Sequence, residues 1–131
     1  MSDRSAARSP GQDGTELLAT GRAAVRAAAE ELTAGREPSR DQLRDAARQG
    51  LRALAAKAPG RSVEVRVPPW AAVQCISGTR HTRGTPGAVV ETDPVTWVQL
   101  AAGLVTFADA VSDGRVRAGG ERSDLSALLP L

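Results

Sequence analysis

The stretch that decides the fold is residues 88–103, which read AVVETDPVTWVQLAAG. Ala88 to Thr92 is a short run rich in β-branched residues, as is typical of a strand. Asp93 and Pro94 then supply a helix N-cap and a proline at the first helical position, and Gly103 supplies a C-cap. The stretch therefore predicts a strand that leads directly into a helix.

The N-terminal part of the chain begins without any apolar pattern. Residues 1–14 are polar and contain proline and glycine, so we expect a disordered tail there. A first helix is predicted from Thr15, with Gly35 as its stop. Its apolar positions, at helical spacing, are Leu18, Val25 and Leu32. The sequence thus predicts one domain over residues 15–131, after the tail.

A second helix completes a helical part that covers residues 15–59. Ser39 and Gln42 form a capping box at its start, and the pair Pro59-Gly60 ends it. Arginines recur every four residues along one side, at Arg40, Arg44, Arg48 and Arg52. Such a stripe is typical of a solvated face, on which neighbouring aspartates here reduce the repulsion between the arginines. It is also typical of a surface for an anionic partner.

Residues 61–131 show the sequence patterns of β-strands and of further helices. Val63 to Val67 alternates apolar and polar residues, and Pro68-Pro69 requires an edge or a bend after it. Further strands are predicted over residues 70–76, 79–84, 88–92 and 115–118, a short helix from Thr106, and a last helix over Ser123 to Leu129. Two helices, a run of strands and then further helices predict an α+β fold with about five strands.

Composition limits the function classes. The 131 residues fit one domain, and 41% are apolar, so a core is expected. Basic residues number 17 against 15 acidic ones, which lacks the clustered surplus of a nucleic-acid binder. The most apolar stretch, Val95 to Val111, is too short and polar to span a bilayer, so no membrane insertion is expected. The single cysteine, Cys75, indicates a reducing, cytoplasmic compartment.

The residues that most enzymes and metal sites need are scarce. His81 is the only histidine and Cys75 the only thiol, so the usual zinc ligand sets are missing from the sequence. Nucleophile elbows, Walker loops and dinucleotide-binding glycine motifs are also missing. We therefore expect no enzyme, no cofactor and no metal site. An enzyme that uses His81 and Cys75 is kept as a third alternative.

One basic segment has the chemistry of an anion site. Arg80, His81 and Arg83 lie within a few residues of Gly84, and glycine is a residue type that can expose backbone N–H groups to a ligand. The segment fits the polar rim of a ligand pocket. It also fits a turn whose arginines pair with Glu91 or Asp93 and brace the fold.

From Val63 to Leu131 the chain resembles a bacterial sterol-carrier-like domain, of the sterol carrier protein type two-like family and its short stand-alone members. The resemblance lies in three ordered motifs: VRVPPWAAVQC, RHTRGTPGAVVETDPVTWVQLAAG and FADAVSDGRVRAGGERSDLSALLPL. It implies a curved, five-stranded sheet covered by helices, with an apolar cavity between the two layers that takes acyl chains or sterols in lipid-carrying relatives.

The hypothesis that follows is a non-enzymatic domain that binds a small apolar or fatty-acid-like ligand. Its pocket is predicted to be lined by Trp97, Leu100, Leu104, Phe107, Val111, Leu125, Leu128 and Leu129. The same eight residues also fit ordinary core packing. The alternative function is a protein-interaction module or a homodimer with a filled core, which uses its sheet edge or the arginine stripe.

Overall fold

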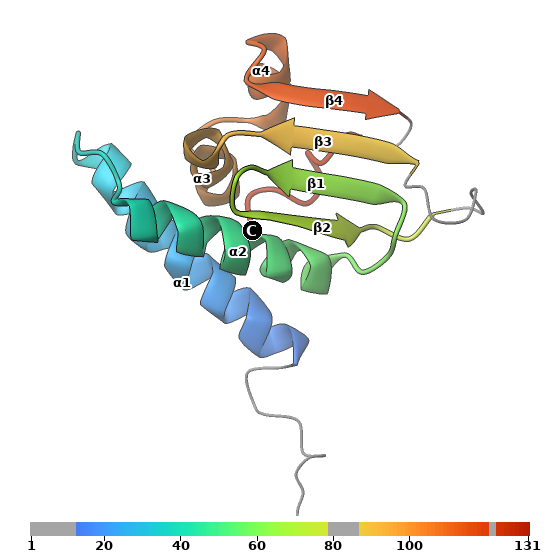
Figure 1. Ribbon diagram of the computed structural model, residues 1–131, viewed down its shortest axis with the longest axis horizontal. Helices are drawn as coiled ribbons and strands as arrows, with labels where there is room; N and C mark the ends of the chain where they lie inside the picture. The colour runs from blue at the N-terminus through green and yellow to red at the C-terminus, as the bar shows by residue number, and fades with distance from the viewer. Residues whose placement is uncertain (1–12, 79–86, 121–122) are drawn as a thin grey trace, which may run out of the picture.

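The computed structural model describes residues 13–78, 87–120 and 123–131, and these form helices and strands in the order expected of an α+β fold (Figure 1). The elements are α1 (Gly14–Thr33), α2 (Arg40–Lys57), β1 (Val63–Val67), β2 (Ala71–Cys75), β3 (Ala88–Thr92), α3 (Pro94–Ala102), α4 (Phe107–Ser112) and β4 (Val116–Gly120). The two N-terminal helices and the mixture of strands and helices after them are confirmed.

The strands form one mixed sheet in the order β2-β1-β3-β4. β1 pairs antiparallel with β2 and parallel with β3, and β3 pairs antiparallel with β4. Alternation along β1 places Val63, Val65 and Val67 in the core, while Arg66 is exposed on the opposite face. β1 is therefore an inner strand, and Pro68-Pro69 lies in the turn that follows it, where Trp70 N–H donates to the Val67 oxygen at 3.0 Å.

The described residues hold four of the roughly five strands that were expected. The fifth was predicted over residues 79–84, and this segment lies outside the described residues. Its sequence, TRHTRG, has no apolar side chain for a sheet face to bury, so the pattern behind that prediction was weak.

Helices α1, α2 and α3 and the C-terminal segment cover one face of the sheet and its β2 edge, and α4 lies beside β4 (Figure 1). α2 runs alongside β2, α1 packs on the far side of α2, and α3 and the C-terminal segment lie behind the sheet. The largest fully buried side chains include Trp97, Leu51, Leu54 and Leu125. Together with the valines of β1, they fill the space between the sheet and the helices.

Small residues bring α1 and α2 close together. A Cβ added at Gly21 of α1 would lie 2.6 Å from the main-chain oxygen of Gln49 in α2. A Cβ at Gly50 would lie 2.9 Å from Nε1 of Trp97. These two glycines therefore allow α1 to cross α2 and α3 to seat its indole against α2.

Local capping explains where the helices begin. Ser39 and Gln42 form the predicted capping box, with bonds of 3.0 and 2.8 Å. The carboxylate of Asp93 accepts from Thr96 N–H at 3.0 Å, with Pro94 next to it. The carboxylate of Asp13 accepts from Glu16 N–H at 2.9 Å, so α1 begins at Gly14, next to the predicted start near Thr15.

The predicted helix over Ser123 to Leu129 is wrong, because residues 123–131 contain only a turn over residues 126–128. The backbone groups of this segment find tertiary partners instead. Leu131 N–H donates to the Ala101 oxygen at 3.0 Å, and Lys57 Nζ donates to the Leu128 oxygen at 2.7 Å. Pro130 also disfavours the α conformation in the residue before it.

Candidate functional site

Two of the eight predicted ligand-contacting residues are central core residues. Trp97 and Leu125 are each 1% exposed. The indole N–H of Trp97 donates to the Ala46 oxygen at 2.9 Å, which ties α3 to α2. The layer where the resemblance implied a cavity is therefore filled at these two positions.

Three more of the predicted residues line a cleft of about 230 Å³ between α3, α4 and the C-terminal segment. These are Leu100, Phe107 and Leu129. Of the remaining three, Leu128 packs half-buried against the core, whereas Leu104 is 44% and Val111 38% exposed. The structure thus distributes the eight residues over the core, two hollows and the surface, and their role in ligand binding stays a prediction.

Leu104 belongs to a second, larger hollow, a groove of about 370 Å³. One wall is α1, and the other is the end of α3 together with Leu104, Pro130 and Leu131. The apolar lining residues are Val25, Ala29, Ala101, Ala102, Leu104, Pro130 and Leu131. We call this hollow the α1–α3 groove. Val25, Ala29 and Ala101 are buried and form its floor, while Leu104 stays exposed at its side.

The polar lining of the α1–α3 groove comes from α1. It consists of Arg22, Arg26, Glu30 and Thr33. Arg22 Nε donates to a main-chain oxygen of Leu131 at 3.0 Å. Arg26 is exposed, and its guanidinium has neither a hydrogen bond nor an ion pair with any other described residue. The groove therefore combines an apolar floor with the positive charge of Arg26, which has no partner among the described residues.

The C-terminal segment holds the other wall in place. Besides the Leu128 oxygen, Lys57 Nζ contacts the Pro130 oxygen at 3.1 Å. Pro130 lines both the groove and the smaller cleft, and it lies against Gly103, where an added Cβ would be 3.3 Å from the proline Cγ. The two hollows are thus neighbours on either side of Pro130.

Sequence reasoning missed the α1 side of this groove. Arg22 and Arg26 lie four residues apart beside the apolar stripe of the first helix, but the same spacing also occurs in the arginine stripe of α2. The spacing alone does not reveal which arginines face an apolar groove, because that depends on how α1 crosses α3.

A third hollow, of about 480 Å³, is lined mainly by charged and polar residues. It is lined by Pro68, Glu91, Thr92, Asp93, Gly114, Arg115 and Arg117. Its arginines are already engaged: Arg117 pairs with Glu91, and Arg115 pairs with Asp113 at 3.0 Å. This third hollow is larger than the α1–α3 groove. Its arginines, however, already have carboxylate partners and are therefore less available to a ligand.

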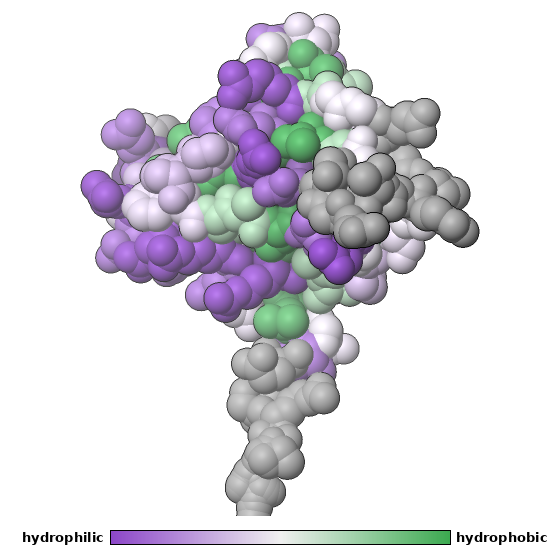
Figure 2. Space-filling model, turned by 45° about the vertical axis from the view of Figure 1, so that its right-hand side comes forward, coloured by the Kyte–Doolittle hydropathy of each residue, from purple (hydrophilic) through white to green (hydrophobic). Residues whose placement is uncertain are grey.

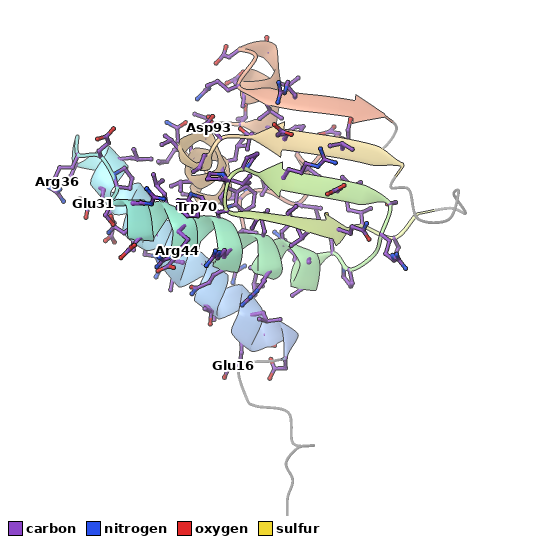
Figure 3. All side chains as sticks on the ribbon, viewed as in Figure 1. Glu16, Glu31, Arg36, Arg44, Trp70 and Asp93 are labelled. Carbon is purple, nitrogen blue, oxygen red and sulfur yellow. The ribbon has the colours of Figure 1, made fainter. Side chains whose placement is uncertain are left out.

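The predicted polar rim of Arg80, His81 and Arg83 lies outside the described residues. The two carboxylates proposed to brace it are described, and both have other partners. Glu91 pairs with Arg117, and its Oε1 lies 3.9 Å from Nη1 of Arg66. Figure 2 shows that the face it draws carries hydrophilic side chains with apolar patches between them. Asp93 caps α3 and also accepts from Thr96 Oγ1 at 2.7 Å (Figure 3).

The arginine stripe of α2 is partly neutralised. Arg44 pairs with Asp41 at 3.1 Å and with Asp45 at 3.2 Å, as the solvated-face interpretation expects. The Arg40 guanidinium lies 5.2 Å from the ring centroid of Trp70, which projects toward α2 (Figure 3). These contacts favour the solvated face over an anion-binding surface.

The lone thiol is buried. Burial raises the pKa of Cys75 from 9.0 to about 11, so its thiolate, the nucleophilic form, is scarce at neutral pH. Within residues 13–78, 87–120 and 123–131, no three His, Cys, Asp or Glu side chains cluster as a metal site requires. In the same residues, no helix is both long and apolar enough to cross a membrane.

Comparison with known proteins gives one family. No curated protein matches the chain in sequence. The family described as bacterial SCP ortholog matches residues 39–131, from the N-cap of α2 through the sheet, α3, α4 and the C-terminal segment, and α1 precedes the matched residues. The match extends the sterol-carrier-like resemblance of residues 63–131 back to Ser39. The chain belongs to this bacterial SCP ortholog family, a family of sterol-carrier-like domains.

Proposed function

We propose that this chain is a non-enzymatic domain that binds a small apolar or amphipathic, lipid-like ligand in the α1–α3 groove. Membership of a sterol-carrier-like family supports a lipid-type ligand. The volume of about 370 Å³ lies within the range of small-molecule sites. The enzymatic alternative loses support because Cys75 is buried with a raised pKa.

The observation that carries the proposal is the exposure of Leu104 beside a buried apolar floor. Leu104 is 44% exposed, and it borders Val25, Ala29 and Ala101 in the groove. A ligand that covers this surface gains roughly 25 cal/mol for each Å² of apolar area removed from water. A lipid tail suits such a surface because it has no polar groups that need a hydrogen-bond partner.

Titration with the neutral dye Nile red, which fluoresces in apolar surroundings, tests the proposal. Leu104→Ser should weaken dye binding several-fold, since it puts a hydroxyl beside the floor. Val111→Ser is the matched control, because Val111 is similarly exposed at 38% but does not line the groove. Equal binding by both variants, or no binding by the wild type, would contradict the proposal.

A homodimer is the second candidate function. β4 is an edge strand, and four of its five residues are exposed. No other described segment pairs with its free edge, and unpaired strand edges are templates for pairing with another chain. Sedimentation velocity over a wide concentration range distinguishes the candidates: a stable dimer supports pairing through β4, and a monomer throughout rejects it.

A further inference from the structure

We propose that Arg26 of α1 binds the anionic head of the ligand, so that the α1–α3 groove selects amphiphiles with a negatively charged head. This inference rests on the function proposed above and adds a chemical class and a residue. It also assigns the selectivity to α1, the helix that precedes the family-matched residues 39–131.

The two walls of the groove differ in origin and in charge. The wall made of Ala101, Ala102, Leu104, Pro130 and Leu131 comes from the family-matched residues and carries no charged side chain. All the charged side chains that line the groove come from α1. The family domain thus supplies an apolar wall, and α1 supplies the charges that discriminate between head groups.

Of the two arginines, Arg26 is the one whose whole guanidinium makes no contact with a hydrogen-bond or ion-pair partner among the described residues. Arg22 uses its Nε to hold a main-chain oxygen of Leu131, so part of its donor set is committed to the fold. Arg26 has no hydrogen bond or ion pair with a described residue. Many other arginines of the described chain are engaged, as Arg44, Arg66 and Arg117 are with carboxylates.

Glu30 is the opposing charge in the same wall. It lies one helical turn after Arg26, yet the two side chains form no ion pair within 4.0 Å. The charged side chains of the groove are therefore two arginines and one glutamate, with Arg26 positioned between Arg22 and Glu30 along α1. A guanidinium presents up to five N–H donors and suits a two-oxygen head such as a carboxylate.

The experiment compares dodecanoate with dodecanol, which share a chain length and differ in the charge of the head, by displacement of Nile red at neutral pH. The wild type should bind dodecanoate several-fold more tightly than dodecanol. Arg26→Gln should abolish this preference, because it should weaken the binding of dodecanoate far more than that of dodecanol. Glu30→Gln should increase the preference, because it removes the repelling carboxylate.

The matched control is Arg48→Gln, which removes an exposed arginine of α2 that does not line the groove. It should keep the wild-type preference, and a loss as large as that of Arg26→Gln would overturn the inference as an effect of net charge. Equal binding of both ligands by the wild type overturns the inference and leaves the proposed function standing. Binding of neither ligand overturns both.

Discussion

The indole N–H of Trp97 donates to the main-chain oxygen of Ala46 across 2.9 Å, with both residues buried. This bond joins α3 to α2 at a point where Gly50 leaves room for the ring. It explains why Trp97 belongs to the core, since a buried indole needs a partner for its N–H and finds one there.

Removing this side chain should be costly. We expect Trp97→Ala to lower the free energy of unfolding by about 3 to 5 kcal/mol, from lost transfer energy and the cavity left behind. Trp97→Phe keeps an aromatic ring but loses the hydrogen bond, and should cost less than Trp97→Ala. Urea unfolding measures both values. A near-zero cost for Trp97→Ala would show that the ring does not support the core.

Gly21 should resist substitution although it lies within a helix. Gly21→Ala gains roughly 1 kcal/mol of helix propensity, but its Cβ would lie 2.6 Å from the Gln49 oxygen. We expect the free energy of unfolding to fall by about 1 to 3 kcal/mol, because the backbone of α1 or α2 has to move to make room for the Cβ. Gly14→Ala, where the nearest atom is 4.0 Å away, is the control and should not destabilise. Thermal unfolding that shows equal stability for both variants would contradict the close crossing of α1 and α2.

The raised pKa of Cys75 predicts a loss of stability at alkaline pH. The thiol of the unfolded chain ionises near pH 9.0, whereas the buried thiol keeps its proton up to about pH 11. The stability from this protonated thiol is full below pH 9.0 and declines as the pH rises toward 11, by roughly 2 to 3 kcal/mol. Urea unfolding of wild type and Cys75→Ala across this range measures it. Parallel pH profiles would mean that the thiol does not contribute.

Lys57 should keep the C-terminal segment on the domain. Its ammonium contacts the Leu128 and Pro130 oxygens, and Leu131 N–H donates to the Ala101 oxygen nearby. We expect Lys57→Met to speed hydrogen exchange at the Leu131 amide about tenfold, since the segment opens more often. Arg52→Met, on the same helix and away from the segment, should leave exchange unchanged. Unchanged exchange in Lys57→Met would assign the anchoring to other contacts.

Arg83→Ala separates the two interpretations of the basic segment. Because Glu91 and Asp93 already have partners, we expect the free energy of unfolding to change by less than about 0.5 kcal/mol. A larger loss would support bracing of the fold. If the segment holds an acidic head, dodecanoate affinity should fall in Arg83→Ala, whereas unchanged affinity would reject that role.

Local patterns determined where the helices and most strands begin. The capping box of Ser39 and Gln42, the Asp93-Pro94 start of α3 and the left-handed Gly103 at its C-cap each depend on neighbours a few residues away. The alternation of Val63 to Val67 likewise reports one buried face. These features were predictable because their hydrogen bonds and their burial repeat over a few residues.

The tertiary structure alone decided the rest. The parallel pairing of β1 with β3, the non-helical course of Leu128 to Leu131 and the approach of Leu104 to α1 all depend on contacts between residues far apart in the sequence. A leucine pattern such as that of residues 125–129 fits a helix, a core or a groove equally well, because the spacing of apolar residues does not indicate which residues they will contact. Trp97 entered the core and Leu104 stayed exposed for this reason: the crossing of α1 and α2 over α3 sets which apolar side chains are covered.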